Sequence, residues 1–254
     1  MESLTLTRVE MSSLLLALRG MSADTPLHIF QEAWCRHHRR HAVEESPLQE
    51  LRSTELPPIV LKMMKKGEAK GLSLQEIAAL GALIEYSTIS ITAMQNWVKR
   101  DFKEYLGAPR EGKKYSINQA AMLFMVEDLK SSLDFRSISR LFRKLFLKPE
   151  RDDDDLLEPV RLYAAYAQLF EEHREITAAP AGEPASEANA ASDRLTGDAM
   201  SAAAEKAVTR LVHLNRRQRE TVRNTLIIAA ISVQACCFQA LARQYFHASL
   251  FLDF

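Results

Sequence analysis

Residues 89–116 read ISITAMQNWVKRDFKEYLGAPREGKKYS, and this stretch decides both the fold and the function that we expect. It opens with short polar side chains and leads into a tryptophan that is followed by lysine and arginine. A Gly–Ala–Pro break and a second basic cluster, ending in a tyrosine, come next. The pattern predicts a helix over 90–105 and a turn over 108–114, because glycine and proline interrupt both helix and strand patterns.

The predicted helix has two faces. Apolar residues recur at helical spacing along one of them: Ile91, Met94, Val98, Phe102 and Leu106. Off this stripe lie side chains of the kinds that contact base edges and phosphates in a major groove: Thr92, Gln95, Asn96, Lys99, Arg100 and Lys103. The turn adds four more candidates and predicts a wing-like hairpin whose cations meet phosphates: Arg110, Lys113, Lys114 and Tyr115. The alternative is an ordinary amphipathic helix with a solvated polar face, and Trp97 fits a core or hinge position better than a base-stacking one.

A supporting helix is expected just before the predicted recognition helix, over 73–85. Ser73 and Glu76 form the capping-box pattern at its start. This order is that of a helix–turn–helix. The connection GALIEYST is longer than a tight helix–turn–helix turn, so whether Gln95 and Asn96 face a groove stays open.

Composition agrees with a helical, polyanion-binding chain. The 254 residues are 47% hydrophobic and include only 8 glycines and 9 prolines, which favours a largely helical protein. The formal net charge is zero, but 88–148 holds 12 Lys and Arg against 6 Asp and Glu, whereas 150–200 holds 4 against 13. A basic module therefore stands next to an acidic segment.

Other classes of protein find little support. Three cysteines make no disulfide framework and, with no recognisable signal peptide, predict a cytoplasmic protein. No nucleophile, base and orienting acid occur in a catalytic pattern, so we expect no enzyme and no cofactor. His37 and His41 are spaced i, i+4 in WCRHHRRH, but no carboxylate accompanies them, and a solvated basic patch is favoured over a metal site.

The rest of the chain divides by composition. We expect an N-terminal helical segment (1–43), a central module (44–150), an acidic loop and helix (151–177), a disordered linker (178–195) and a helical self-association region (196–254). Within the last region, 225–242 is 18 residues without a charge. Length permits a membrane span, but Thr225, Ser232, Gln234 and Gln239 favour a buried or self-associating helix.

Five short motifs together resemble one bacterial family. They are ELPP (55–58), SITAMQNWVKR (90–100), GKKYS (112–116), LK (129–130) and FRSISRLF (135–142). The family is catalogued only as a domain of unknown function, and its members look like MerR-type winged helices of Gram-positive bacteria. The resemblance covers about 55–150 and implies a winged helix–turn–helix that binds DNA.

The sequence thus predicts an all-α chain with a MerR-like winged module and flanking helices. The expected function is DNA-binding transcriptional regulation, with double-stranded DNA as the partner and a homodimer as the form that reads two half-sites. Two alternatives remain open. One is a protein–protein interaction or adaptor module without DNA binding, and the other is a membrane-tethered regulator anchored through 225–242.

Overall fold

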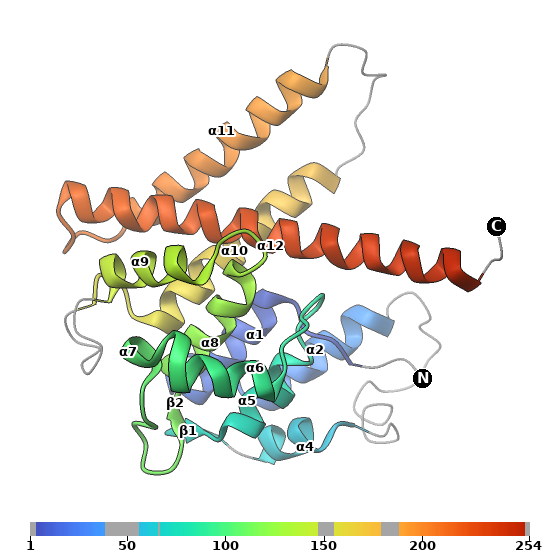
Figure 1. The fold of residues 1–254 in the computed structure, drawn as a ribbon, viewed down its shortest axis with the longest axis vertical. Coiled ribbons are helices and arrows are strands. Elements are labelled where there is room, and N and C mark those ends of the chain that lie inside the picture. Colours follow the sequence, from blue (N-terminus) through green and yellow to red (C-terminus); the bar gives the residue numbers. More distant parts are fainter. Residues whose placement is uncertain (1–3, 39–55, 66, 147–154, 179–187, 252–254) are drawn as a thin grey trace. The chain divides into compact units, whose positions relative to one another are not determined.

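The computed structural model of the protein describes residues 4–38, 56–65, 67–146, 155–178 and 188–251 (Figure 1). Within these ranges the chain forms eleven α-helices, one π-helical turn and one two-stranded sheet. The predicted helical class is confirmed, with this small antiparallel sheet as an addition to it. The elements are α1 (Arg8–Leu18), α2 (Pro26–His38), α4 (Pro58–Lys65), β1 (Gly71–Leu72), α5 (Leu74–Gly81), α6 (Ile91–Asn96), η1 (Trp97–Asp101), α7 (Lys103–Leu106), β2 (Tyr115–Ser116), α8 (Ile117–Leu129), α9 (Phe135–Leu145), α10 (Pro159–Ala178), α11 (Ala188–Thr209) and α12 (Arg216–Phe251).

The chain separates into two compact units. Unit 1 comprises residues 1–127 and 159–164, and unit 2 comprises 128–158 and 165–254. The predicted recognition helix and basic turn both belong to unit 1, whereas α9, α11 and α12 belong to unit 2.

Helix α8 supplies much of the core of unit 1. Its sequence, INQAAMLFMVEDL, is apolar on nearly every side, and all of its residues are buried. A helix that is apolar all round must be enclosed by its neighbours. Phe124 meets the ring of Tyr163 from the start of α10, with centroids 6.0 Å apart.

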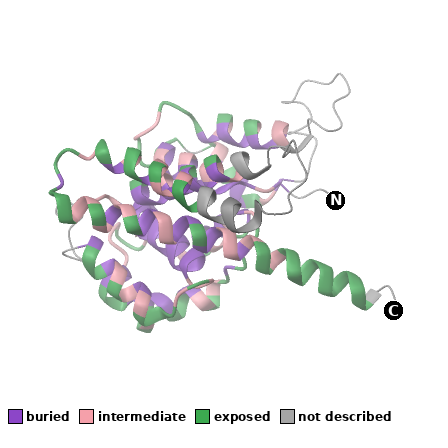
Figure 2. Ribbon diagram, turned by 90° about the horizontal axis from the view of Figure 1, so that it is seen from above, coloured by how far each residue is buried: buried purple, intermediate pink, exposed green. Residues whose placement is uncertain are grey.

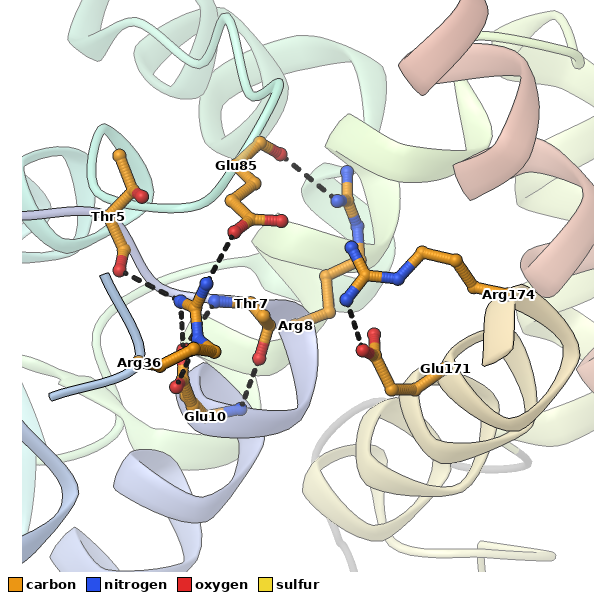
Figure 3. Close-up of polar contacts among 8 residues, drawn as sticks. All are labelled: Thr5, Thr7, Arg8, Glu10, Arg36, Glu85, Glu171 and Arg174. Atoms are coloured by element: carbon orange, nitrogen blue, oxygen red, sulfur yellow. Dashed lines mark hydrogen bonds and ion pairs between the residues drawn. The ribbon is translucent and has the colours of Figure 1, made fainter. Parts of the chain in front are cut away.

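The N-terminal segment is hydrogen-bonded to the loop between α5 and α6. Leu6 pairs with this loop in a parallel bridge: its N–H donates to the Leu83 carbonyl at 2.7 Å, and the Glu85 N–H donates to the Leu6 carbonyl at 2.9 Å. Arg36 of α2 donates two hydrogen bonds to the Glu10 carboxylate, at 2.9 and 2.8 Å, and one to Glu85 at 3.1 Å (Figure 3). Burial acts to lower the pKa of Arg36, but Glu10 and Glu85 raise it. The loop that leads into α6 is therefore held by charged hydrogen bonds, which are stronger than neutral ones.

Helix α5 begins with the capping box that the sequence predicts. The Ser73 hydroxyl accepts from the Glu76 N–H at 3.2 Å, and the Glu76 carboxylate accepts from the Ser73 N–H at 2.7 Å. Lys62 of α4 forms an ion pair with the same carboxylate. The helix ends at Gly81 rather than near 85, and an added Cβ at Gly81 would lie 2.6 Å from the Ile89 side chain.

The ionisation of Glu76 gives a pH-dependent stability. Burial acts to raise the pKa of Glu76, but hydrogen bonds from Lys62 and Ser73 outweigh it and lower the pKa from 4.5 to about 2. A carboxyl whose pKa is lower in the folded state stabilises the fold above its unfolded pKa, and this contribution is lost as pH falls from about 5 towards 2. We expect Glu76→Gln to cost roughly 2–3 kcal/mol at pH 7 and progressively less below pH 5. Urea unfolding of both proteins from pH 7 to pH 3 measures the difference, and a difference that does not change with pH would contradict this assignment.

Unit 2 is built on a helical hairpin of α11 and α12, joined by residues 210–215 (Figure 1). Arg223 of α12 pairs with Glu205 of α11 at 3.0 Å. Helix α9 contacts α12, and its Ile138, Phe142 and Leu145 are buried. The turn before α9 is tied to α12, because the Ser131 hydroxyl donates to the Ser232 carbonyl at 2.6 Å.

The stretch 178–195, for which the sequence predicts a disordered linker, overlaps the start of α11. Helix α11 begins at Ala188 and thus includes the last residues of that stretch. Alanine has the highest helix propensity, and it recurs here at 188, 190 and 191. Residues 179–187 lie outside the described part of the chain.

Among the described helices, α12 is long and apolar enough to cross a membrane by length and composition. The same test is also passed by core helices of soluble proteins, and 39% of its apolar window is buried within the structure.

Candidate nucleic-acid interface

The predicted recognition helix is interrupted near its middle. Helix α6 ends at Asn96, a π-helical turn covers Trp97–Asp101, and a short α7 follows after Phe102, so the expectation of one regular helix over 90–105 is wrong. The Phe102 N–H donates to the Trp97 carbonyl at 2.9 Å, which is the i→i+5 bond of a π turn. The apolar spacing explains the π turn. Met94, Val98 and Phe102 are four residues apart, which is more than the about 3.6 residues of an α-helical turn, and a wider turn keeps all three on the buried side of the segment.

The interior side of this segment is fixed by burial. Met94, Val98 and Phe102 are all buried, and Trp97 is only 3% exposed. Trp97 is therefore a core aromatic, as the sequence favoured. The start of α6 is held from behind as well, because buried Glu127 of α8 accepts hydrogen bonds from the Thr88 N–H and hydroxyl, both at 3.1 Å.

The outer side carries every predicted contact residue of the segment. All six side chains are exposed: Thr92, Gln95, Asn96, Lys99, Arg100 and Lys103. Gln95 and Asn96 thus point to solvent and do not pack inward. Lys99, Arg100 and Lys103 form no ion pair with any residue in the described ranges. Their charges are accordingly not neutralised within that part of the protein.

The basic turn is a tight hairpin. The N–H of Glu111 donates to the Lys114 carbonyl at 2.9 Å, and the N–H of Lys114 donates to the Glu111 carbonyl at 3.1 Å. Gly112 has φ +65° and Lys113 has no positive φ, which is the pattern of a type II′ turn. Glycine is preferred at the first central position of such a turn because a side chain there is strained. Lys113 consequently stands exposed at the tip.

The remaining turn residues are half-buried. Lys114 and Tyr115 follow the tip. Burial raises the pKa of the Tyr115 hydroxyl, which is protonated at neutral pH. The Arg110 guanidinium donates to the Tyr105 carbonyl at 3.2 Å, which directs part of that side chain to its own backbone.

The base of the hairpin is anchored by the small sheet. Strand β2 pairs antiparallel with β1, with Leu72 opposite Tyr115 and Gly71 opposite Ser116. The backbones approach closely at Gly71, where an added Cβ would lie 2.6 Å from the Tyr115 carbonyl oxygen. Strand β1 is followed directly by α5, and it also pairs with β2 at the base of the hairpin. The backbone of β1 therefore links the hairpin to the predicted supporting helix.

Gln119 of α8 is the residue that the sequence analysis missed. Its fully buried side chain accepts from the N–H groups of Ser116, at 2.9 Å, and Arg110, at 3.3 Å. It also donates to the carbonyls of Leu106 and Ala108, the latter at 2.8 Å. One amide therefore joins the end of α7, the loop after it and β2. A polar side chain inside an otherwise apolar helical run was the signal that could have identified it.

The structure does not test whether the N-terminal histidines bind a metal. His41 lies outside the described residues, as do the positions of the His37 and His38 side chains. Elsewhere in the described chain, no three His, Cys, Asp or Glu side chains gather as a metal site.

Comparison with known proteins identifies relatives of this chain. The family model described as domain of unknown function DUF1836 matches residues 54–167. A curated protein of Bacillus subtilis (strain 168), named uncharacterized protein YkrK, is 35% identical over 168 residues, which cover 65% of this chain and 68% of that protein. No solved structure matches the chain. The matched region contains both the segment α6–η1 and the basic hairpin, and the chain belongs to the DUF1836 family.

Proposed function

We propose that the protein is a cytoplasmic, DNA-binding transcriptional regulator with a MerR-like winged helix–turn–helix in unit 1. Helix α5 is the supporting helix, the segment α6–η1 enters the major groove, and the hairpin 111–114 contacts the flanking phosphates. The proposal assigns no catalytic role and no cofactor.

The observation that carries this proposal is the division of side chains along α6 and η1. Short polar and basic residues occupy the solvent side, whereas the residues between them are buried. A recognition helix needs this division, because its apolar side packs on its own domain while amides read base edges and cations meet phosphates. An adaptor surface for proteins does not call for this excess of cations at its centre, since charged residues are depleted there.

The II′ hairpin adds a second element in the order that a winged module requires. It follows the recognition segment in the chain, is anchored to the strand that precedes α5, and raises Lys113 into solvent. Between 89 and 116 there are six Lys and Arg against three Asp and Glu. Attraction to phosphate supplies much of the affinity of such surfaces and all of their non-specific binding.

The base-reading role of α6 can be separated from its phosphate contacts. A preferred site is first selected from a random duplex pool with the full-length protein. We expect Gln95→Ala/Asn96→Ala to lose roughly 10–100-fold in preference for the selected site over a scrambled one, since each good amide–base contact discriminates by about 1–3 kcal/mol. Binding to the scrambled duplex should stay nearly unchanged.

Competition anisotropy with the two duplexes measures both quantities. Glu104 is exposed on α7, and Glu104→Ala serves as the control outside the polar side of α6. Equal loss of affinity for both duplexes in the Gln95/Asn96 variant would argue against base reading. Failure to select any duplex would favour the adaptor alternative.

A further inference from the structure

Helix α12 has two apolar faces, and unit 2 covers only one of them. The covered face contacts the interior of the unit through Val222, Leu226, Ala229, Val233 and Cys236, all buried. On the other side, large apolar side chains remain exposed: Ile231 by 51%, Phe238 by 63%, Leu241 by 45% and Tyr245 by 71%. Figure 2 shows the C-terminal part of α12 exposed along its length, and residues 241–250 are all exposed.

The exposed side chains follow the spacing of a coiled-coil seam. Ile231, Phe238 and Tyr245 are seven residues apart, and Leu241 comes three after Phe238. Half-buried Ile227 lies four residues before Ile231, and half-buried Gln234 lies three residues after it. The six positions 227, 231, 234, 238, 241 and 245 therefore follow the spacing 4-3-4-3-4. Successive a and d positions of a heptad have this spacing, and it keeps one narrow stripe facing a partner helix.

The C-terminal part of α12, residues 241–250, is exposed at every position. A single helix without packing is marginal in water, because its stability comes mostly from burial of an apolar face. The four exposed seam residues offer roughly 400 Å² of apolar side chain, taking about 150–250 Å² for each large residue. A standard interface buries about 800 Å² per partner, of which somewhat more than half is apolar. The stripe thus supplies most of the apolar area that one side of a stable dimer requires.

We propose that a second copy of this chain covers the stripe, in a parallel and in-register pair of α12 helices. Parallel pairing places each seam residue opposite its own copy, so the two Gln234 side chains meet and can hydrogen-bond to each other. A single polar layer of this kind fixes register in coiled coils. Antiparallel pairing centred on the same seam sets Gln234 against Phe238 and leaves the amide without a partner. The pairing does not depend on DNA binding.

The charges on α12 favour a second copy over a lipid surface. Amphipathic helices that lie on membranes have many cations on the polar side. Between residues 225 and 251, α12 carries one charged side chain, Arg243. A membrane span requires all sides of the helix to face lipid, whereas the side of α12 at 222–236 is already buried in unit 2.

The test compares two pairs of charge substitutions on the same exposed helix. Phe238→Glu/Tyr245→Glu places four carboxylates in the seam of a dimer. Phe246→Glu/Leu250→Glu adds the same charge at apolar residues that are 61% and 60% exposed but lie off the seam. Sedimentation equilibrium of the full-length protein without DNA should give a dimer for the wild type and for the off-seam variant, and a monomer for the seam variant, with at least a hundredfold rise in the dissociation constant. All four residues are exposed in the single chain, so the folded monomer is expected to survive, and circular dichroism checks this.

A cross-linking experiment tests the register. With Cys35, Cys236 and Cys237 replaced by serine, Gln234→Cys should form a disulfide-linked dimer under mild oxidation, whereas Arg243→Cys should not.

A monomeric wild type at tens of micromolar would overturn the proposal, as would loss of the dimer in the off-seam variant. Co-sedimentation of the wild type with anionic vesicles, abolished by both pairs of substitutions, would assign the stripe to a membrane instead. Disulfide formation at Arg243 but not at Gln234 would overturn the assigned seam.

Discussion

Replacing Gln119 with leucine is expected to destabilise the protein by about 3–5 kcal/mol. The side chain is fully buried, and it satisfies two backbone N–H groups and two carbonyls at the base of the hairpin. Removing it leaves these groups without their partner. The bonds to Ser116 and Leu106 are buried and those to Arg110 and Ala108 are partly buried, and each unsatisfied buried group costs on the order of 1–3 kcal/mol. Urea unfolding of the purified full-length chain measures the loss.

Two further variants show whether the loss of stability comes from the hydrogen bonds of Gln119 or from replacing any glutamine with leucine. Gln75 is exposed on α5, and Gln75→Leu should change the unfolding free energy by less than about 0.5 kcal/mol. Gln119→Glu keeps one oxygen that can accept from the Ser116 and Arg110 N–H groups, but it replaces the donor NH₂ group with a second carboxylate oxygen that faces the Leu106 and Ala108 carbonyls. It should be as damaging as leucine. A Gln119→Leu protein as stable as the Gln75→Leu control would show that the hairpin does not depend on this amide.

The close approach of β1 to β2 makes Gly71→Ala the second large effect. An added methyl group would lie 2.6 Å from the Tyr115 carbonyl oxygen and 2.9 Å from the Glu111 Cβ, and the first of these atoms belongs to a backbone that cannot rotate away. The strands must separate, and we expect a loss of about 2–3 kcal/mol, typical of steric conflict at a buried position. Trypsin should then cleave the hairpin faster after Lys113 or Lys114, because local opening exposes its backbone.

Gly67 provides a matched control in the same segment. A Cβ there meets no atom within 4 Å. Gly67→Ala should therefore be neutral or slightly stabilising, since alanine restricts the unfolded chain. Equal stability and equal cleavage rates for the two alanine variants would contradict the role given to the Gly71 contact.

Local patterns in the sequence predicted the features that depend on neighbouring residues. The capping box of Ser73 and Glu76 was recognisable because both groups act within one helical turn. The burial of Met94 and Phe102 followed from helical spacing, whereas the spacing left the orientation of Gln95 open. The type II′ turn was only partly predictable: Gly112 marked a turn, but its class depends on backbone angles set by the pairing of β1 with β2.

Features that depend on residues far apart in the chain could not be read in this way. Gln119 binds groups 3 to 13 residues away, and no spacing rule connects an amide to the carbonyl of Leu106. The ion pair of Arg36 with Glu85 joins residues 49 positions apart, and no pattern in the neighbouring sequence predicted it.

If the hairpin of unit 1 contacts DNA phosphate, the affinity for DNA must fall with rising salt concentration, and the hairpin must account for part of that fall. Fluorescence anisotropy of a labelled duplex, titrated with the full-length protein across a series of salt concentrations, gives the slope of log affinity against log salt. Lys113→Ala/Lys114→Ala should weaken binding and flatten that slope by roughly one to two units, because about one counterion is released for each phosphate contact. Lys206→Ala/Arg210→Ala removes the same charge from two exposed positions of unit 2, one on α11 and one just after it, and should leave the slope unchanged. Absence of binding at low salt, or the same change of slope in both variants, would contradict the account.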